Sequence, residues 1–224
     1  MTRFHAYRAF FQKTGRMRFL SHHDLVRMFT RALRRTGLPL RWSEGFTPRP
    51  VLSFPLALGI GIESLEEAFE FELTEAADPE ALLADLNRQM PGEPGEIRFV
   101  SVEPVAKAGR GRVAAVEVRI EFHAAPPDLP ERVREFLGRS ESRVERPAGG
   151  PGHPAKSVDV RPYVEDLRAE EGGLLWARIR VTGQGTTRPQ EIVQALGLPP
   201  SSPRRTIKVK THFETKAREV ADTH

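Results

Sequence analysis

The clearest periodic pattern in the chain lies between residues 21 and 37. Apolar side chains recur there at intervals of three and four residues, which is the spacing of one buried helix face. They are Leu25, Met28, Phe29, Ala32 and Leu33. Ser21 can cap the first turn with Asp24 completing a capping box, and Gly37 is a typical C-terminal stop. The pattern therefore predicts an amphipathic helix. Its opposite face carries Arg27, Arg31, Arg34 and Arg35.

Extended runs predict strands on both sides of this helix. The run at 68–73 alternates, with its acids on the outer side, as in a half-buried strand. The expected strands of this half are 6–13, 68–73 and 97–102, and the segments 51–54 and 56–62 look extended. A second helix is expected to start with Asp78 as its cap and Pro79 in its first turn. The resulting order of elements is β-α-β-β-α-β.

The same order returns in the second half of the chain. Strands are expected at 116–123, 157–160, 174–181 and 206–213, and helices at 130–137 and 189–196. We therefore predict an α+β protein of two tandem ferredoxin-like (βαββαβ) units, with antiparallel sheets and helices on one face. The expected boundaries are a unit at 1–106, a linker at 107–112, a unit at 113–214 and a flexible tail at 215–224.

Composition narrows the class of protein. The chain has no cysteine, which excludes disulfides, thiol nucleophiles and cysteine-held metal centres. No apolar run approaches the roughly 20 residues that span a bilayer, and the start of the sequence lacks a signal-peptide core. We therefore expect a cytoplasmic protein without a membrane partner. The sequence predicts no metal site and no cofactor.

Charge is segregated along the sequence. Residues 1–50 hold eleven basic and two acidic side chains, a net +9, whereas residues 51–100 hold two basic and eleven acidic ones, a net −9. A basic field favours a polyanionic partner, and arginine pairs bidentately with phosphate. We therefore expect RNA to bind here. The predicted contacts are Arg16, Arg18, Arg27, Arg31, Arg34, Arg35, Arg41 and Arg49. The alternative is a solvated helix face whose arginines pair with the acids of 63–96.

The segment 41–50 combines aromatic side chains with glycine and proline. Trp42 and Phe46 stand beside Arg41 and Arg49, and aromatic rings next to guanidinium groups suit the stacking of single-stranded bases. The alternative, equally compatible with the sequence, is that both rings fill the core of the domain while the prolines fix a turn.

Three basic residues of the second half complete the predicted RNA surface. Lys156 and Arg161 belong to a charged strand segment that suits either an interdomain groove or a surface salt-bridge ladder. Arg188 precedes a helix whose first N–H groups could hold an anion, although a capped helix start explains the same residues.

The run His22, His23 and Asp24 is the candidate for catalysis. A histidine at the start of a helix can act as a general acid or base near neutral pH. Adjacent histidines do not share a helix face, so the pair does not suit one metal ion. The alternative is that Ser21 and Asp24 cap the helix beside exposed histidines.

Several motifs resemble those of a known family. They are FQKTGRMRFLSHHDL at 11–25, RALRRTGLP at 31–39, SEGFTPRP at 43–50, KSVDVRP at 156–162 and RPQE at 188–191. Together they are similar to the radical-SAM-linked family of uncharacterised proteins. The resemblance implies a stand-alone chain that works beside a radical SAM protein, because without cysteine it cannot hold the cluster itself. Its family's genes often neighbour those of ribonuclease G and ribosomal proteins.

These observations favour a non-catalytic, RNA-binding accessory protein that works with a radical SAM partner or in ribosome or RNA metabolism. One alternative is an RNA-processing or RNA-modifying enzyme subunit that uses His22 or His23. Another is an adaptor that binds the radical SAM protein without nucleic acid.

Overall fold

The computed structural model describes residues 4–90, 96–106, 111–147 and 154–214. The predicted tail at 215–224 and most of the predicted linker at 107–112 lie outside the described residues. In the first half the elements are β1 (His5–Lys13), η1 (Gly15–Phe19), α1 (His22–Arg35), β2 (Leu52–Ser53), β3 (Glu63–Leu73), α2 (Pro79–Arg88) and β4 (Ile97–Val105). In the second half they are β5 (Val113–Phe122), α3 (Leu129–Gly138), β6 (Arg143–Arg146), β7 (Lys156–Asp159), η2 (Arg161–Tyr163), β8 (Val164–Glu170), β9 (Leu174–Arg180), α4 (Pro189–Ala195) and β10 (Pro203–Phe213).

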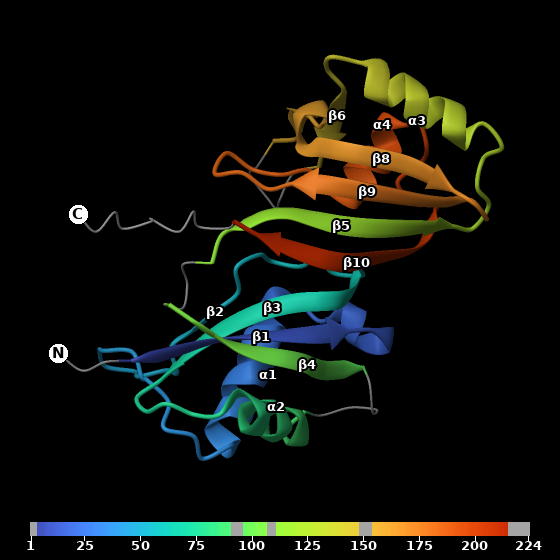
Figure 1. Cartoon of the computed structure of the whole chain (residues 1–224). Helices are drawn as coiled ribbons and strands as arrows, with labels where there is room; N and C mark the ends of the chain where they lie inside the picture. The colour runs from blue at the N-terminus through green and yellow to red at the C-terminus, as the bar shows by residue number, and fades with distance from the viewer. Residues whose placement is uncertain (1–3, 91–95, 107–110, 148–153, 215–224) are drawn as a thin grey trace, which may run out of the picture.

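The strands of both halves join in one sheet (Figure 1). Its order is β4-β1-β3-β10-β5-β9-β8, with β2 paired to β3, while β6 and β7 form a separate two-stranded sheet. All pairs are antiparallel except β3 with β10, which run parallel at the junction of the halves. The predicted α+β class is confirmed. The sequence pattern gave no sign that one sheet would continue through both halves.

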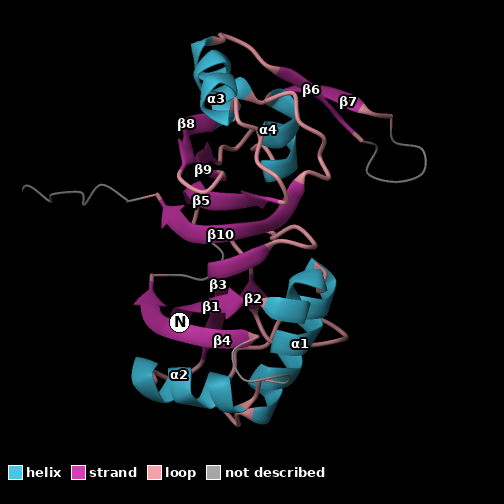
Figure 2. Cartoon of the chain, turned by 90° about the vertical axis from the view of Figure 1, so that its right-hand side faces the viewer, coloured by secondary structure: helices cyan, strands magenta, loops and turns pink. Residues whose placement is uncertain are grey.

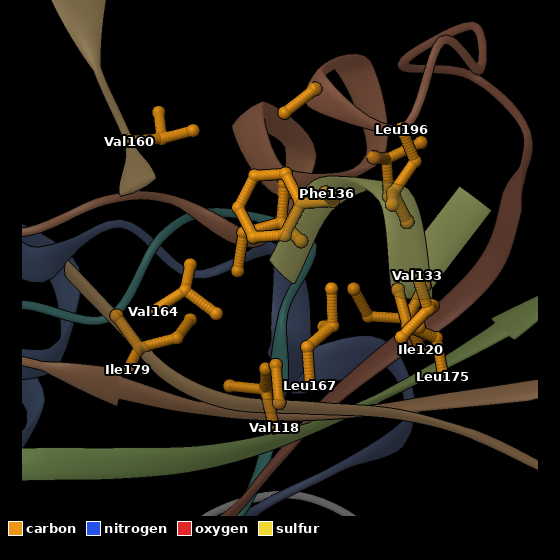
Figure 3. Packing of buried hydrophobic residues seen from close by; sticks show 14 of the residues in the cluster. Val118, Ile120, Val133, Phe136, Val160, Val164, Leu167, Leu175, Ile179 and Leu196 are labelled. Carbon is orange, nitrogen blue, oxygen red and sulfur yellow. The ribbon is translucent and has the colours of Figure 1, made fainter. Parts of the chain in front are cut away.

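Two hydrophobic cores lie on the same face of this sheet. Cross-strand neighbours point to the same side of a sheet. From β1 to β5 the consecutive neighbours are Lys13, Ser64, Lys208 and Val118. The first core packs α1 and α2 on β1, β3 and β4. The second packs α3 and α4 on β5, β8 and β9, as Figure 3 shows for Phe136 and its neighbours. The helices of both halves therefore cover one side of the sheet (Figure 2).

The structure corrects two segments that the sequence pattern predicts to be extended or to belong to the main sheet. Residues 56–62 form a loop because Gly61 adopts a φ of +83° and its N–H bonds to the Arg18 carbonyl at 2.8 Å. The segment 157–160 lies in the small β6–β7 sheet. The main sheet instead takes β8, which the sequence pattern missed, since a shift in register between Val164 and Asp166 interrupts the alternation of buried positions.

Candidate nucleic-acid interface

Helix α1 begins with the predicted capping box. The Ser21 hydroxyl oxygen accepts a bond from the Asp24 N–H at 3.2 Å, and the Asp24 carboxylate accepts from the Ser21 N–H at 3.2 Å and from its hydroxyl at 2.6 Å. These bonds lower the pKa of Asp24 below its ordinary value. The cap fixes where the helix starts, and therefore which of its residues face the core. The buried face consists of Leu25, Phe29, Ala32 and Leu33.

The opposite face of α1 presents a stripe of exposed arginines. Arg27, Arg31, Arg34 and Arg35 are all exposed. Arg35 donates to the Gln89 carbonyl at 2.9 Å. The other three form no ion pair within 4.0 Å with any residue that the structure describes. Because residues three and four apart are neighbours on a helix surface, these three guanidinium groups share one solvent-facing row.

The segment 41–50 is a tight hairpin beside this row. Trp42 pairs with Pro50, and the Ser43 N–H bonds to the Arg49 carbonyl at 2.8 Å. Phe46 lies near the tip with a relative exposure of 110%, and Trp42 is 42% exposed. The Arg34 guanidinium carbon lies 5.0 Å from the centre of the Trp42 ring. Neither ring fills the core, so the interpretation in which both rings fill the core of the domain is wrong.

Part of the basic segment is neutralised within the chain: three of the eight arginines predicted to contact RNA here, and also Arg8, pair with carboxylates. Arg8, which faces Glu70 across β1 and β3, pairs with it at 2.8 Å. Further pairs join Arg16 to Glu96 and Arg18 to Glu63, both at 3.5 Å, and Arg41 to Glu72. The acidic stretch reaches these arginines because β1 lies between β3, which carries Glu63, Glu70 and Glu72, and β4, which Glu96 directly precedes. Arg49 is exposed and has no ion pair among the described residues.

Neither histidine forms a hydrogen bond or an ion pair within 4.0 Å with a described carboxylate. His22 packs edge-on against Phe54, with ring centres 5.2 Å apart, and its ring centre lies 6.0 Å from that of the exposed His23. The Asp24 carboxylate is occupied by the helix cap. Within the described ranges no three His, Cys, Asp or Glu side chains are grouped so that they could hold a metal ion.

The three later basic residues belong to the second half, across the β3–β10 junction from α1 (Figure 2). Lys156 is exposed on β7. Arg161 donates to the carbonyls of Val164, Leu137 and Arg139 at 2.9–3.2 Å, so its guanidinium stabilises the chain around η2. Arg188 is exposed at the start of α4, 4.0 Å from Glu191. The structure therefore does not gather them with the α1 row.

The sequence analysis missed a buried charged cluster at the junction, formed by Lys13, Ser64, Glu67 and Lys208, which we call the junction cluster. The Lys208 ammonium lies 2.6 Å from a Glu67 oxygen, and their side chains are 3% and 2% exposed. Lys13 is fully buried and donates to the carbonyls of Arg18 and Leu20 at 3.3 and 3.4 Å. Burial lowers the pKa of Lys13 to about 8, against the opposing pull of Glu67. The only sequence signal for this cluster was a lysine on each of two predicted strands, Lys13 on β1 and Lys208 on β10.

A cleft of about 700 Å³ opens beside this cluster. Its walls come from the 56–62 loop, from Val116 and Val118 on β5, and from the start of α4, and Lys208 contributes to its lining.

No described helix is long and apolar enough to cross a membrane. A family model described as "Uncharacterized protein conserved in bacteria (DUF2344)" matches residues 6–189. No curated protein matches the sequence. Among solved structures, the chain is similar to a protein in the crystal structure of a Cbf5-Nop10-Gar1 complex, with 10% identity and a TM-score of 0.44. The alignment covers 92% of this chain and 48% of that one, so this chain spans about half that protein's length. A likeness at this TM-score carries no argument about function.

Proposed function

The chain belongs to the DUF2344 family, uncharacterized proteins conserved in bacteria, and because membership assigns no activity we propose from its surface that it binds RNA. In this proposal the α1 row (Arg27, Arg31 and Arg34) holds phosphates and the 41–50 hairpin stacks on bases. The supporting observation is that three exposed arginines without an ion pair among the described residues share one helix face, and that one of them, Arg34, lies over the exposed Trp42 ring of the hairpin that also carries the exposed Phe46.

The α1 row suits a phosphate backbone. Its side chains are spaced by about one helical turn, roughly 5–6 Å between neighbouring Cβ atoms. No described carboxylate lies within 4.0 Å of these guanidinium groups, so a phosphate would not have to break an ion pair to reach them. Each phosphate neutralised in this way releases a counterion, which predicts binding that weakens steeply as salt rises.

The hairpin supplies the aromatic part of the site. Phe46 is fully exposed on a turn whose ends are closed by hydrogen bonds, so stacking a base on it requires little ordering of the chain. Arg34 already lies over Trp42, which holds both groups beside the row. Stacking on exposed aromatic rings favours unpaired bases, and we therefore propose single-stranded RNA as the ligand.

The fold and the resemblance extend this proposal. The strand orders β4-β1-β3-β2 and β10-β5-β9-β8 repeat one plan in the two halves, which supports two tandem ferredoxin-like units merged into one sheet. The sequence motifs support a role as the stand-alone accessory of a cytoplasmic radical SAM protein, to which it would present RNA.

The test reverses the charge of the α1 row. We expect the triple variant Arg27→Glu, Arg31→Glu and Arg34→Glu to weaken binding of a fluorescein-labelled, mixed-sequence, single-stranded RNA on the order of 100-fold in low salt. Fluorescence anisotropy measures the affinity. The fold should persist, because all three side chains are exposed.

A control of equal charge change separates a site from a general field. Arg134, Arg143 and Arg168 are also exposed, but each pairs with a neighbouring carboxylate. Their replacement by Glu should leave most of the affinity. Equal losses in the two triple variants would mean that net charge alone attracts RNA, and an unchanged affinity in the first would refute the site.

A further inference from the structure

The cleft at the junction of the two halves has mainly apolar walls. It measures about 700 Å³, a size typical of small-molecule sites. The 56–62 loop contributes Leu56 and Ile60, and the sheet contributes Val118 and Ile179. Ile60 is 63% exposed although it is a large apolar residue. Removing such surface from water is favourable, so an apolar ligand would gain affinity from these walls.

The buried charges beside the cleft already have partners. The Lys208 ammonium is buried and lies 2.6 Å from a Glu67 oxygen, so a ligand cannot reach it. Glu191 accepts hydrogen bonds from Arg146 at 2.6 and 2.9 Å and from the Thr187 hydroxyl at 3.0 Å. A charged ligand group inside the cleft would therefore lose its hydration without gaining a free counterion, which is unfavourable.

The exposed charges of the lining favour neither sign. They are Glu145 on β6 and Arg188 directly before α4, one acid and one base, and both side chains stand in water. An anion and a cation would each meet one attractive and one repulsive group there. The exposed part of the cleft therefore selects no charged ligand.

Two glutamine side chains supply uncharged polar groups to the lining. Gln190 and Gln194 lie four positions apart on α4, which places them on one side of that helix. Both are half-buried and line the cleft. Neither side chain forms a hydrogen bond with a residue that the structure describes. Each amide offers a donor and an acceptor without a net charge, so a neutral ligand group with both functions can pair with it.

We propose that this cleft binds an uncharged, mainly aliphatic molecule that carries an amide or a similar neutral donor–acceptor group. Its hydrocarbon part lies against the 56–62 loop and β5, and its amide pairs with Gln190 or Gln194. An aliphatic ligand fits better than a flat aromatic one, because the described lining contains no aromatic ring on which such a ligand could stack. The α1 row does not line the cleft, so this site is independent of the proposed RNA binding.

The experiment compares three probes that share one hydrocarbon chain: octanamide, octanoate and octylammonium. Each is titrated calorimetrically into the full chain at pH 7, below its micellar concentration. Octanamide should bind about tenfold or more tightly than either ion, because only the ions would bring an unpaired charge into the cleft.

Three variants locate the binding. The double variant Gln190→Leu and Gln194→Leu should weaken octanamide binding about two- to tenfold, because a neutral hydrogen bond is lost. Gln184→Leu, which changes an exposed glutamine outside the cleft lining, should keep the wild-type affinity. Ala57→Trp places a large ring at an exposed position of the cleft wall and should block octanamide.

Absence of octanamide binding to the wild type would overturn the proposal. An ion that binds as tightly as octanamide, unchanged affinity in the double glutamine variant, or octanamide binding that survives Ala57→Trp would do the same. If the double glutamine variant does not fold, the comparison of probes on the wild type and the Ala57→Trp variant decide the question by themselves.

Discussion

The α1 row and the junction cluster bring positive charges together in opposite environments. Arg27, Arg31 and Arg34 stand in water without an ion pair among the described residues. Lys13 and Lys208 lie beneath two packed cores and share one carboxylate. The first group is held in place by the periodicity of one helix, whereas the second is assembled by three strands from both ends of the chain.

This difference separates the roles that charge can have in one protein. A solvated guanidinium costs little and contributes little to folding, so its effect is seen in binding. A buried ammonium loses its hydration, and its balance with neighbouring charges therefore affects folding. Mutations in the α1 row should change affinity at constant stability, while mutations in the junction cluster should change stability.

The strongest challenge to this distinction is Glu67→Gln. It removes the carboxylate that offsets two buried lysines, and we expect the free energy of unfolding to fall by about 3–5 kcal/mol. Urea denaturation measures the change. Glu75→Gln, at an exposed position without an ion pair among the described residues, should stay within about 0.5 kcal/mol of the wild type. A Glu67→Gln protein as stable as the wild type would show that the buried charges are not coupled.

The pH dependence of the free energy of unfolding tests the lowered pKa of Lys13. Its pKa is about 8 in the folded chain and 10.5 in the unfolded one, so between these values the unfolded chain binds more protons. The free energy of unfolding should therefore rise from pH 8 to 10.5, by at most about 3 kcal/mol from this group. Lys13→Met should lack this component of the rise. Identical pH profiles for the wild type and the variant would contradict the assignment.

The smallest expected effect concerns Phe46, on the exposed hairpin beside the α1 row. Phe46→Ser should weaken binding of single-stranded RNA by about 1–3 kcal/mol, the contribution of one stacked base, while stability changes by less than about 0.5 kcal/mol. Anisotropy titrations and thermal melts measure the two quantities. Leu65→Ala, which changes an exposed apolar residue on β3, should affect neither. A loss of stability in Phe46→Ser would mean that the ring supports the fold.

Local signals predicted the elements that depend on neighbouring residues. Helix α1 followed from its cap and its three-to-four spacing, and the capping box at Ser21 and Asp24 formed as expected. The hydrophobic pattern gave wrong or missing strands where pairing with distant parts of the chain determines the structure. The 56–62 segment is apolar enough for a strand, but Gly61 turns it into a loop across the junction. Strand β8 was not predicted because its buried positions do not alternate regularly.

The candidate sites divide in the same way. The arginine row could be predicted because a helix places Arg27, Arg31 and Arg34 on one face whatever the remainder of the fold. That Arg8, Arg16, Arg18 and Arg41 are neutralised could not be predicted, since each partner lies at least 31 positions away in the sequence. The exposure of Trp42 and Phe46 could not be predicted either, because it depends on the hairpin that holds both rings outside the core.

The sequence by itself determined the α+β class, the amphipathic first helix and the segregation of charge, because each is a property of adjacent residues and their periodicity. Tertiary structure decided the rest: the parallel contact of β3 with β10, the carboxylates that neutralise Arg8, Arg16, Arg18 and Arg41, and the meeting of Lys13, Glu67 and Lys208. Those features depend on which distant strands become neighbours, and pairing at that range is fixed by the packing of the whole chain.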